Sequence, residues 1–144
     1  MVTKEEVADL FIRGLDCSQI VAGEFARECG MTREQMIRLT GAYGGGMDIG
    51  ETCGAVMGAM VVLGFLYGQE GPDQDEQKAI AYAKRDEFLK AWGEKRPACS
   101  CRVLLGHDIS IPSELEIVRQ ERTMYTLCPE LVVEAIEIVR RIIS

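Results

Sequence analysis

The chain has 144 residues, which suits one domain and suffices to bury most of the surface that its unfolded form exposes. Its 16 Lys and Arg residues against 23 Asp and Glu residues give a formal net charge of -7. This charge argues against binding to nucleic acid and to anionic membrane surfaces, because like charges repel. The acidic start, MVTKEEVADLF, lacks the basic region and apolar core of a signal peptide, so we expect a cytoplasmic protein.

Helical patterns follow one another through the first forty residues. Two capping boxes, each a Thr three residues before a Glu or Gln, predict helices over 3–14 and 32–39. Between them, Asp16 suits the N-cap of a helix that ends near Gly30. Cys17 then lies in the first turn of that helix, on the face that carries its apolar residues.

The stretch GGGMDIGETCGAVMGAMVVLGFLYG, which begins at Gly44, is the most distinctive part of the chain. Its three consecutive glycines predict a tight loop, and Cys53 then opens a helix that carries no charge as far as Gly68. Gly54 and Gly58 are four residues apart, so another helix can pack very near. The partial positive charge of the helix N-terminus favours a thiolate at Cys53.

Two other interpretations of this uncharged run need weighing. It is also typical of a central buried helix whose cysteine only fills space, as free cysteines often do. A membrane span needs about 18 to 20 apolar residues, and the glycines dilute this run, so we expect no membrane insertion.

The second half of the chain predicts two long helices and a cysteine-bearing loop. Residues 73–95 read as a surface helix that starts acidic and ends basic. The following loop holds Cys99 and Cys101, and a charged helix is expected over 113–126. Cys128 precedes a proline that suits a first helical position, so we expect Cys128 near the N-cap of the last helix.

No segment alternates polar and apolar residues convincingly, so essentially no sheet is expected. The fold class that follows is all-α. We expect one compact domain over residues 1–144, a bundle of about six to seven helices around the Gly/Ala-rich central helix.

Cysteines are the main candidates for chemistry, because structural disulfides are rare in the cytosol. Cys17, Cys53 and Cys128 each open a predicted helix and lie on or beside its apolar face. If these helix starts meet, the thiols share a partly buried, electropositive pocket, which is how reactive or ligating cysteines arise. Cys101 is placed to supply a fourth thiol.

Spacing alone leaves the kind of metal undecided. The short cysteine pairs typical of zinc sites and the ferredoxin spacings of iron–sulfur sites are both missing from the sequence. His107 is the single histidine, which excludes His-rich metal sites within one chain and favours a structural role. Nucleotide-binding and serine-hydrolase motifs are also missing.

Several pieces of the sequence form one recognisable combination: Gly14-Leu15-Asp16-Cys17-Ser18-Gln19, Gly44-Gly45-Gly46, Cys53-Gly54-Ala55-Val56-Met57-Gly58, Cys101 before Leu104-Leu105-Gly106, and Cys128-Pro129. Together they resemble the C_GCAxxG_C_C family of redox-active proteins over nearly the whole chain. Thr52 stands where the family name has Gly, which leaves the predicted helix start intact.

The resemblance implies a small bacterial or archaeal helical protein with four characteristic cysteines, which fall on Cys17, Cys53, Cys101 and Cys128. It makes Cys29 and Cys99 extras, although Cys99 is close enough to Cys101 in the chain to replace it or pair with it. A similar module in split-Soret cytochromes implies an iron–sulfur association. Haem attachment does not carry over, because the chain has no C-x-x-C-H motif.

Three hypotheses follow for the function. In the leading one, the four cysteines converge and bind an iron–sulfur cluster or other metal for electron transfer with an unknown redox partner. In the second, the protein exchanges thiols and disulfides, with Cys53 as the attacking thiolate of lowered pKa and Cys17, Cys101 or Cys128 resolving. In the third, the chain is an interaction module that associates with a membrane transporter, as the family's usual genomic company suggests. A glycine-rich helix face is compatible with a homodimer.

Overall fold

Helices make up nearly all of the regular structure. The computed structural model describes residues 2–144, and in that range the chain forms eight α-helices and one π-helical turn, η1. Their bounds are α1 Lys4–Ile12, α2 Cys17–Glu24, α3 Arg33–Leu39, η1 Gly46–Gly50, α4 Gly54–Tyr67, α5 Asp75–Lys95, α6 Cys101–Leu105, α7 Pro112–Gln120 and α8 Thr123–Ile143. Strand pairing within that range is limited to an isolated bridge between Thr52 and Ser100. The all-α prediction is therefore confirmed, and the helix count is close to the expected one.

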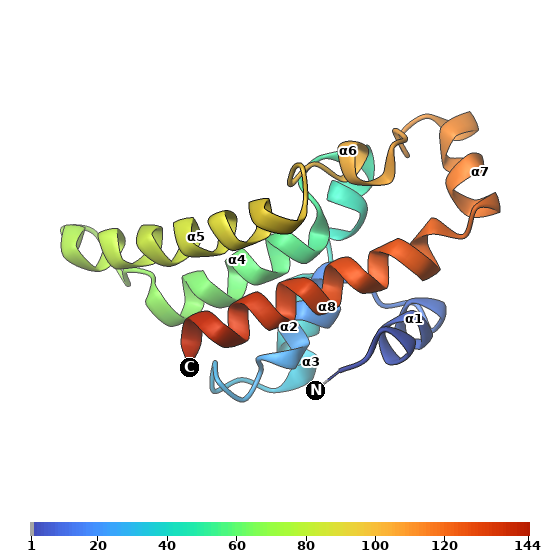
Figure 1. The fold of residues 1–144 in the computed structure, drawn as a ribbon. Coiled ribbons are helices and arrows are strands. Elements are labelled where there is room, and N and C mark those ends of the chain that lie inside the picture. The colour runs from blue at the N-terminus through green and yellow to red at the C-terminus, as the bar shows by residue number, and fades with distance from the viewer. Residues whose placement is uncertain (1) are drawn as a thin grey trace.

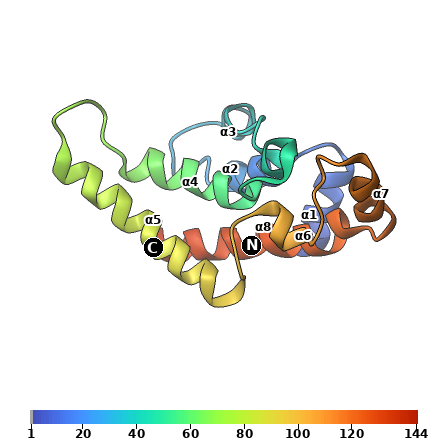
Figure 2. The same cartoon turned by 90° about the horizontal axis from the view of Figure 1, so that it is seen from above.

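The uncharged helix α4 lies at the centre of the bundle, as predicted. It contacts α2, α5 and α8, and Figure 1 shows it running between α5 and α8. Seen from above, α5 crosses the bundle obliquely, while α1 and α7 lie towards the end opposite the α4–α5 connection (Figure 2). Because α4 is covered by three helices, one face of it is buried, with the side chains of Ala55, Val56, Ala59, Val62 and Leu63.

The core is built from the apolar stripes of these helices. Phe88 and Trp92 of α5 are fully buried and stack on one another with ring centroids 5.9 Å apart. The Trp92 indole N–H donates to the carbonyl of Ala98 at 2.9 Å, so its polar edge is satisfied. Burying a side chain of this kind stabilises the fold by about 1.5–3 kcal/mol. A smaller second core lies under α6 and α7, around Cys101, Ile109 and Val118.

The boundary between the last two helices differs from the prediction. The charged helix expected over 113–126 stops earlier, because Arg122 adopts a left-handed conformation with φ 56°. The final helix α8 begins five residues before Cys128, so Cys128 lies in its second turn and the expected position at the N-cap is wrong. Pro129 is buried inside the helix, where packing compensates the helical hydrogen bond that a proline removes.

The second helix is also shorter than expected. Helix α2 ends at Glu24, and the chain continues through turns to Gly30, with the N–H of Cys29 donating to the carbonyl of Phe25 at 3.0 Å. In the described part of the chain, no helix combines the length and apolar character that a membrane crossing requires.

Candidate functional site

Cys17, Cys53, Cys101 and Cys128 line one cavity of about 470 Å³. They come from four helices: the first residue of α2, the N-cap of α4, the first residue of α6 and the second turn of α8. All four are free thiols. The structure therefore brings together cysteines that are as much as 111 positions apart in the sequence, since 128 minus 17 is 111.

Glycines on α4 allow α2 to approach closely enough for this arrangement. A Cβ atom added to Gly54 would overlap the Sγ of Cys17, and one added to Gly58 would lie 2.7 Å from the carbonyl oxygen of Ser18. The buried Ser18 hydroxyl donates to the carbonyl of Thr40 at 2.9 Å, which ties α2 to the end of α3. The small residues of the motif thus place the Cys17 sulfur directly against the start of α4.

The glycine loop forms a left-handed turn at the cavity. Gly45, Gly46, Met47 and Asp48 have φ values of 65°, 58°, 60° and 60°. For Met47 and Asp48 this conformation costs about 1–2 kcal/mol each, because an L side chain crowds the following carbonyl. Gly44 is needed for space, since a Cβ there would lie 2.5 Å from Cγ of Asp16. Backbone strain of this kind is typical of functional sites.

Backbone hydrogen bonds join the segments that carry Cys53 and Cys101. The N–H of Cys53 donates to the carbonyl of Cys99 at 2.6 Å, and the N–H of Cys101 donates to the carbonyl of Glu51 at 2.7 Å. Arg102 strengthens this junction, because it donates to the carbonyl of Gly50 at 3.2 Å and forms an ion pair with Glu51. The starts of α4 and α6 are therefore held side by side.

The thiol of Cys53 is less acidic than the sequence suggested. Burial, and secondarily the nearby Cys17, raises the pKa of Cys53 to about 12. The N–H groups of Ala55 and Val56 at the start of α4 favour the thiolate, as the helix N-terminus was expected to do, but they do not offset the burial. The lowered pKa that was expected for Cys53 is therefore not found, and burial instead makes thiol–disulfide exchange through Cys53 slow near neutral pH.

The other three thiols have the same tendency. Burial, with a smaller contribution from Cys17, raises the pKa of Cys101 to about 11, and burial together with the other three cysteines raises that of Cys128. Burial also raises the pKa of Cys17, although the N–H groups of Gly45 and Ser18 oppose it. Four neutral thiols therefore share the cavity, and a bound cation would favour their deprotonation.

Asp16 and Asp48 also line the cavity, and sequence reasoning did not single them out as site residues. Burial and the charge of Asp48 both raise the pKa of Asp16, which indicates that the two carboxyl groups are close. Their signal in the sequence was their position, since Asp16 precedes Cys17 and Asp48 follows the glycine loop.

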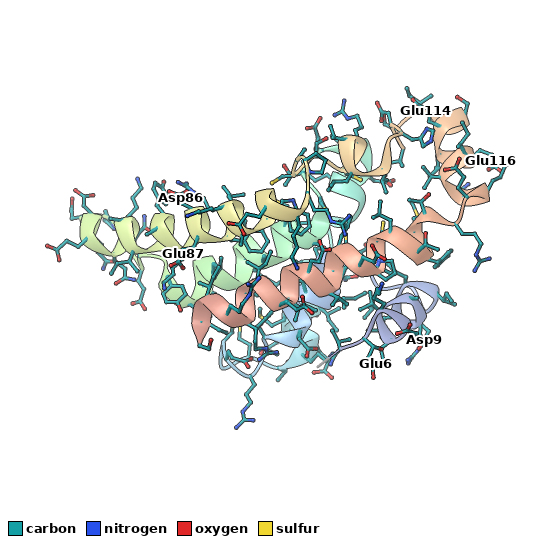
Figure 3. All side chains as sticks on the ribbon, in the orientation of Figure 1. Glu6, Asp9, Asp86, Glu87, Glu114 and Glu116 are labelled. Carbon is teal, nitrogen blue, oxygen red and sulfur yellow. The ribbon has the colours of Figure 1, made fainter. Side chains whose placement is uncertain are left out.

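The remaining candidates lie outside the cavity lining. Cys29 is buried in the main core, and Cys99 is half-buried, contributing its carbonyl rather than its thiol to the junction. His107 lies with its Nδ1 atom 3.7 Å from Oε1 of Glu114, a residue of α7 that Figure 3 labels. Within residues 2–144, no group of three or more His, Cys, Asp or Glu side chains is arranged to hold a single metal ion.

Comparison with known proteins identifies one family. Residues 15–142 match the family model described as "Putative redox-active protein (C_GCAxxG_C_C)". The matched range includes the four cavity cysteines and the glycine loop. Neither the curated proteins nor the solved structures contain a significant match to the chain.

Proposed function

We propose, from the premise that this chain belongs to the C_GCAxxG_C_C family, that it is a redox protein whose four cavity cysteines hold an iron–sulfur cluster for electron transfer. The observation that carries the proposal is the convergence of Cys17, Cys53, Cys101 and Cys128 on one cavity of about 470 Å³. Four cysteine thiolates are the usual ligand set of such clusters.

The dimensions of the site favour a group of several atoms over a single ion. A tetrahedral zinc ion with Zn–S bonds of about 2.3 Å would draw its sulfurs to within roughly 4 Å of one another. The four cysteines line one cavity of about 470 Å³, which has room for a group of several atoms. An iron–sulfur cluster distributes its thiolate ligands over more than one iron atom and so needs a wider site.

The chain provides the environment that such a group needs. When bound, an iron–sulfur cluster supplies one-electron redox chemistry. The N–H groups of Gly45 and Ala55 favour the thiolates of Cys17 and Cys53. Phe11 and Leu131 contribute apolar walls to the cavity, and the N–H groups and these walls would both tune a reduction potential.

The direct test is anaerobic expression and purification, followed by iron and sulfide assays and visible absorption. We expect a coloured, iron- and sulfide-containing protein, and we expect Cys53→Ser and Cys128→Ser each to lower the iron content strongly. Cys29→Ser and Cys99→Ser are matched controls that should retain it, because neither thiol lines the cavity. Colourless, iron-free protein from these preparations would reject the cluster.

A second candidate is dithiol–disulfide exchange between Cys17 and Cys53. The contact of Cys17 Sγ with Gly54, the neighbour of Cys53, supports it. In this reaction the two thiols lose two electrons and two protons to a low-molecular-weight disulfide, which becomes two thiols. Incubation with oxidised glutathione and mass mapping of the linked peptides would test it, and separate glutathione adducts without a Cys17–Cys53 link would count against it. Association with a membrane transporter stays a prediction.

A further inference from the structure

Exposed apolar side chains lie beside the cysteine cavity. Met47 and Ile49 of η1 are 54% and 49% exposed, and Val103 of α6 is 56% exposed. The two elements are in contact, and both views place them next to one another (Figures 1 and 2). Met47 itself lines the cavity, as does Leu104, the neighbour of Val103. We call Met47, Ile49 and Val103 the mouth patch.

Carboxylates lie near the mouth patch, in the cavity lining and beside Arg102. Asp16 and Asp48 line the cavity, while Glu51 and Asp108 flank Arg102, which pairs with Glu51 and lies 4.0 Å from Asp108. This group has four carboxylates against one guanidinium. The surface around the patch is therefore acidic, and it complements a partner with basic side chains.

The acidic surroundings also decide between a different protein and a second copy of this chain. In a twofold dimer across the mouth patch, the same surface would meet itself, so Asp48 and its neighbours would face their own copies. Like charges brought together in this way oppose association. A protein of opposite charge gains from the same arrangement.

We propose that the mouth patch docks a redox partner protein whose contact face has an apolar centre and a rim of lysine and arginine side chains. The proposal rests on the redox function proposed above. A partner on this surface would lie against Met47 and the start of α6, both of which belong to the cysteine cavity. Redox encounters often use small interfaces of less than about 1,200 Å², so a small apolar centre suits a partner of this kind.

Binding to two probe proteins tests the proposal: a basic c-type cytochrome and an acidic flavodoxin. Titration calorimetry at low ionic strength should show binding to the cytochrome, weakening as salt is added, and none to the flavodoxin. Replacing the patch with Met47→Asn and Val103→Gln should raise the dissociation constant about tenfold, a loss of roughly 1.4 kcal/mol. Asn accepts the left-handed backbone at position 47, so the turn is retained.

Matched controls use residues of α5 that lie away from η1 and α6. Ile80→Gln removes a similarly exposed apolar side chain and should leave cytochrome binding unchanged. For the charges, Asp48→Asn removes one carboxylate beside the patch and should weaken cytochrome binding. Asp86→Asn, at a position labelled in Figure 3, makes the same charge change away from the patch and should not. Controls that weaken cytochrome binding as much as the patch variants, or equal binding of the flavodoxin, would overturn the proposal. So would a dimer in analytical ultracentrifugation that the patch variants dissociate.

The result of the binding titrations can be distinguished from the result of the iron assays that test the cluster. Calorimetry needs no electron transfer, so the titrations are repeated on the Cys53→Ser variant. Patch-dependent binding that persists in this variant supports the docking surface even if the iron assays fail. Loss of binding in a folded Cys53→Ser variant that keeps the same circular dichroism as the parent would count against a preformed surface.

Discussion

Gly54 sets how closely Cys17 approaches the start of α4. Gly54→Ala would place a methyl group where the Cys17 sulfur lies, so either the sulfur or the helix must move. We expect the variant to lose about 1–3 kcal/mol in free energy of unfolding, as overpacked cores do. Urea denaturation followed by circular dichroism measures this loss.

Gly64 provides a control in the same helix, because a Cβ added there meets nothing within 4 Å. Gly64→Ala should stabilise the protein by about 0.5–1 kcal/mol, since alanine favours a helix over glycine. Equal effects of the two substitutions would show that Gly54 has no special role in packing against Cys17.

The raised pKa of Cys53 has a consequence for its reactivity. A thiol reacts as its thiolate, and the thiolate fraction grows about tenfold per pH unit below the pKa. In reduced, metal-free protein we expect Cys53 to be half ionised only near pH 12, against about 9.0 for an ordinary thiol. Alkylation rates between pH 7 and 11, resolved by peptide mass mapping, should therefore rise steadily without levelling off.

Denatured protein is the internal reference for that measurement, because its six cysteines are exposed. Their alkylation rates should all level off once the pH exceeds the ordinary thiol pKa. A plateau for Cys53 at or below pH 9.0 in the folded protein would show that the N–H groups of α4 prevail over burial. Thiol–disulfide exchange through Cys53 would then gain support.

The sequence predicted which cysteines meet, but not the carboxyl groups beside them. Cys17 and Cys53 are marked in the sequence by helix-start signals and by neighbouring glycines. In the structure both residues do lie at helix starts, because these signals act locally. Asp48 enters the cavity because it belongs to a left-handed turn, a conformation unusual for a non-glycine residue. No local pattern specifies where such a side chain points.

At the scale of elements, a charged pair ties the end of α5 to α8. Arg96 donates two hydrogen bonds to Glu134, at 2.8 and 2.6 Å, and both side chains are 20% exposed. Glu134→Gln keeps the shape but removes the charge. We expect it to cost about 2 kcal/mol, because paired, partly buried ionic hydrogen bonds are stronger than neutral ones.

The exposed pair of Arg13 and Asp9 is the control, with N–O 3.4 Å and both side chains more than half exposed. Asp9→Asn should change the free energy of unfolding by less than about 0.5 kcal/mol. Thermal denaturation of both variants at two salt concentrations makes the comparison. If Glu134→Gln behaves like Asp9→Asn, the charge of Glu134 contributes little to the α5–α8 junction, which then rests on apolar packing and on the remaining pair of Arg96 with Glu130.

Helix existence was easier to predict than helix ends. Capping boxes at Thr3 and Thr32 mark starts that the structure reproduces, because the side-chain hydrogen bonds act locally. The break before α8 occurs at Arg122, whose left-handed conformation carries no sequence signal, while the proline after Cys128 misleadingly suggests a helix start. The helix instead continues through Pro129, which is buried in the core.

For the whole molecule, the cavity lies where the main core meets the small second core. Cys101 and its helix α6 belong to the small second core, whereas Cys53 belongs to the main core. A group bound by all four cysteines would therefore link the two cores. Because it binds only the folded chain, it should raise stability, by about 2.7 kcal/mol at a hundredfold excess over its dissociation constant.

Removing the iron from the loaded protein with a chelator under reducing, anaerobic conditions is expected to lower the melting temperature and to loosen the protein unevenly. Hydrogen exchange should accelerate in α6 and at the starts of α2 and α4, where the cysteines are anchored, because local openings there lose a shared constraint. The first half of α5, from Asp75, holds no ligand and should exchange at an unchanged rate. Acceleration spread equally over all helices would mean that the iron stabilises the fold only globally, without linking the two cores through the four thiols.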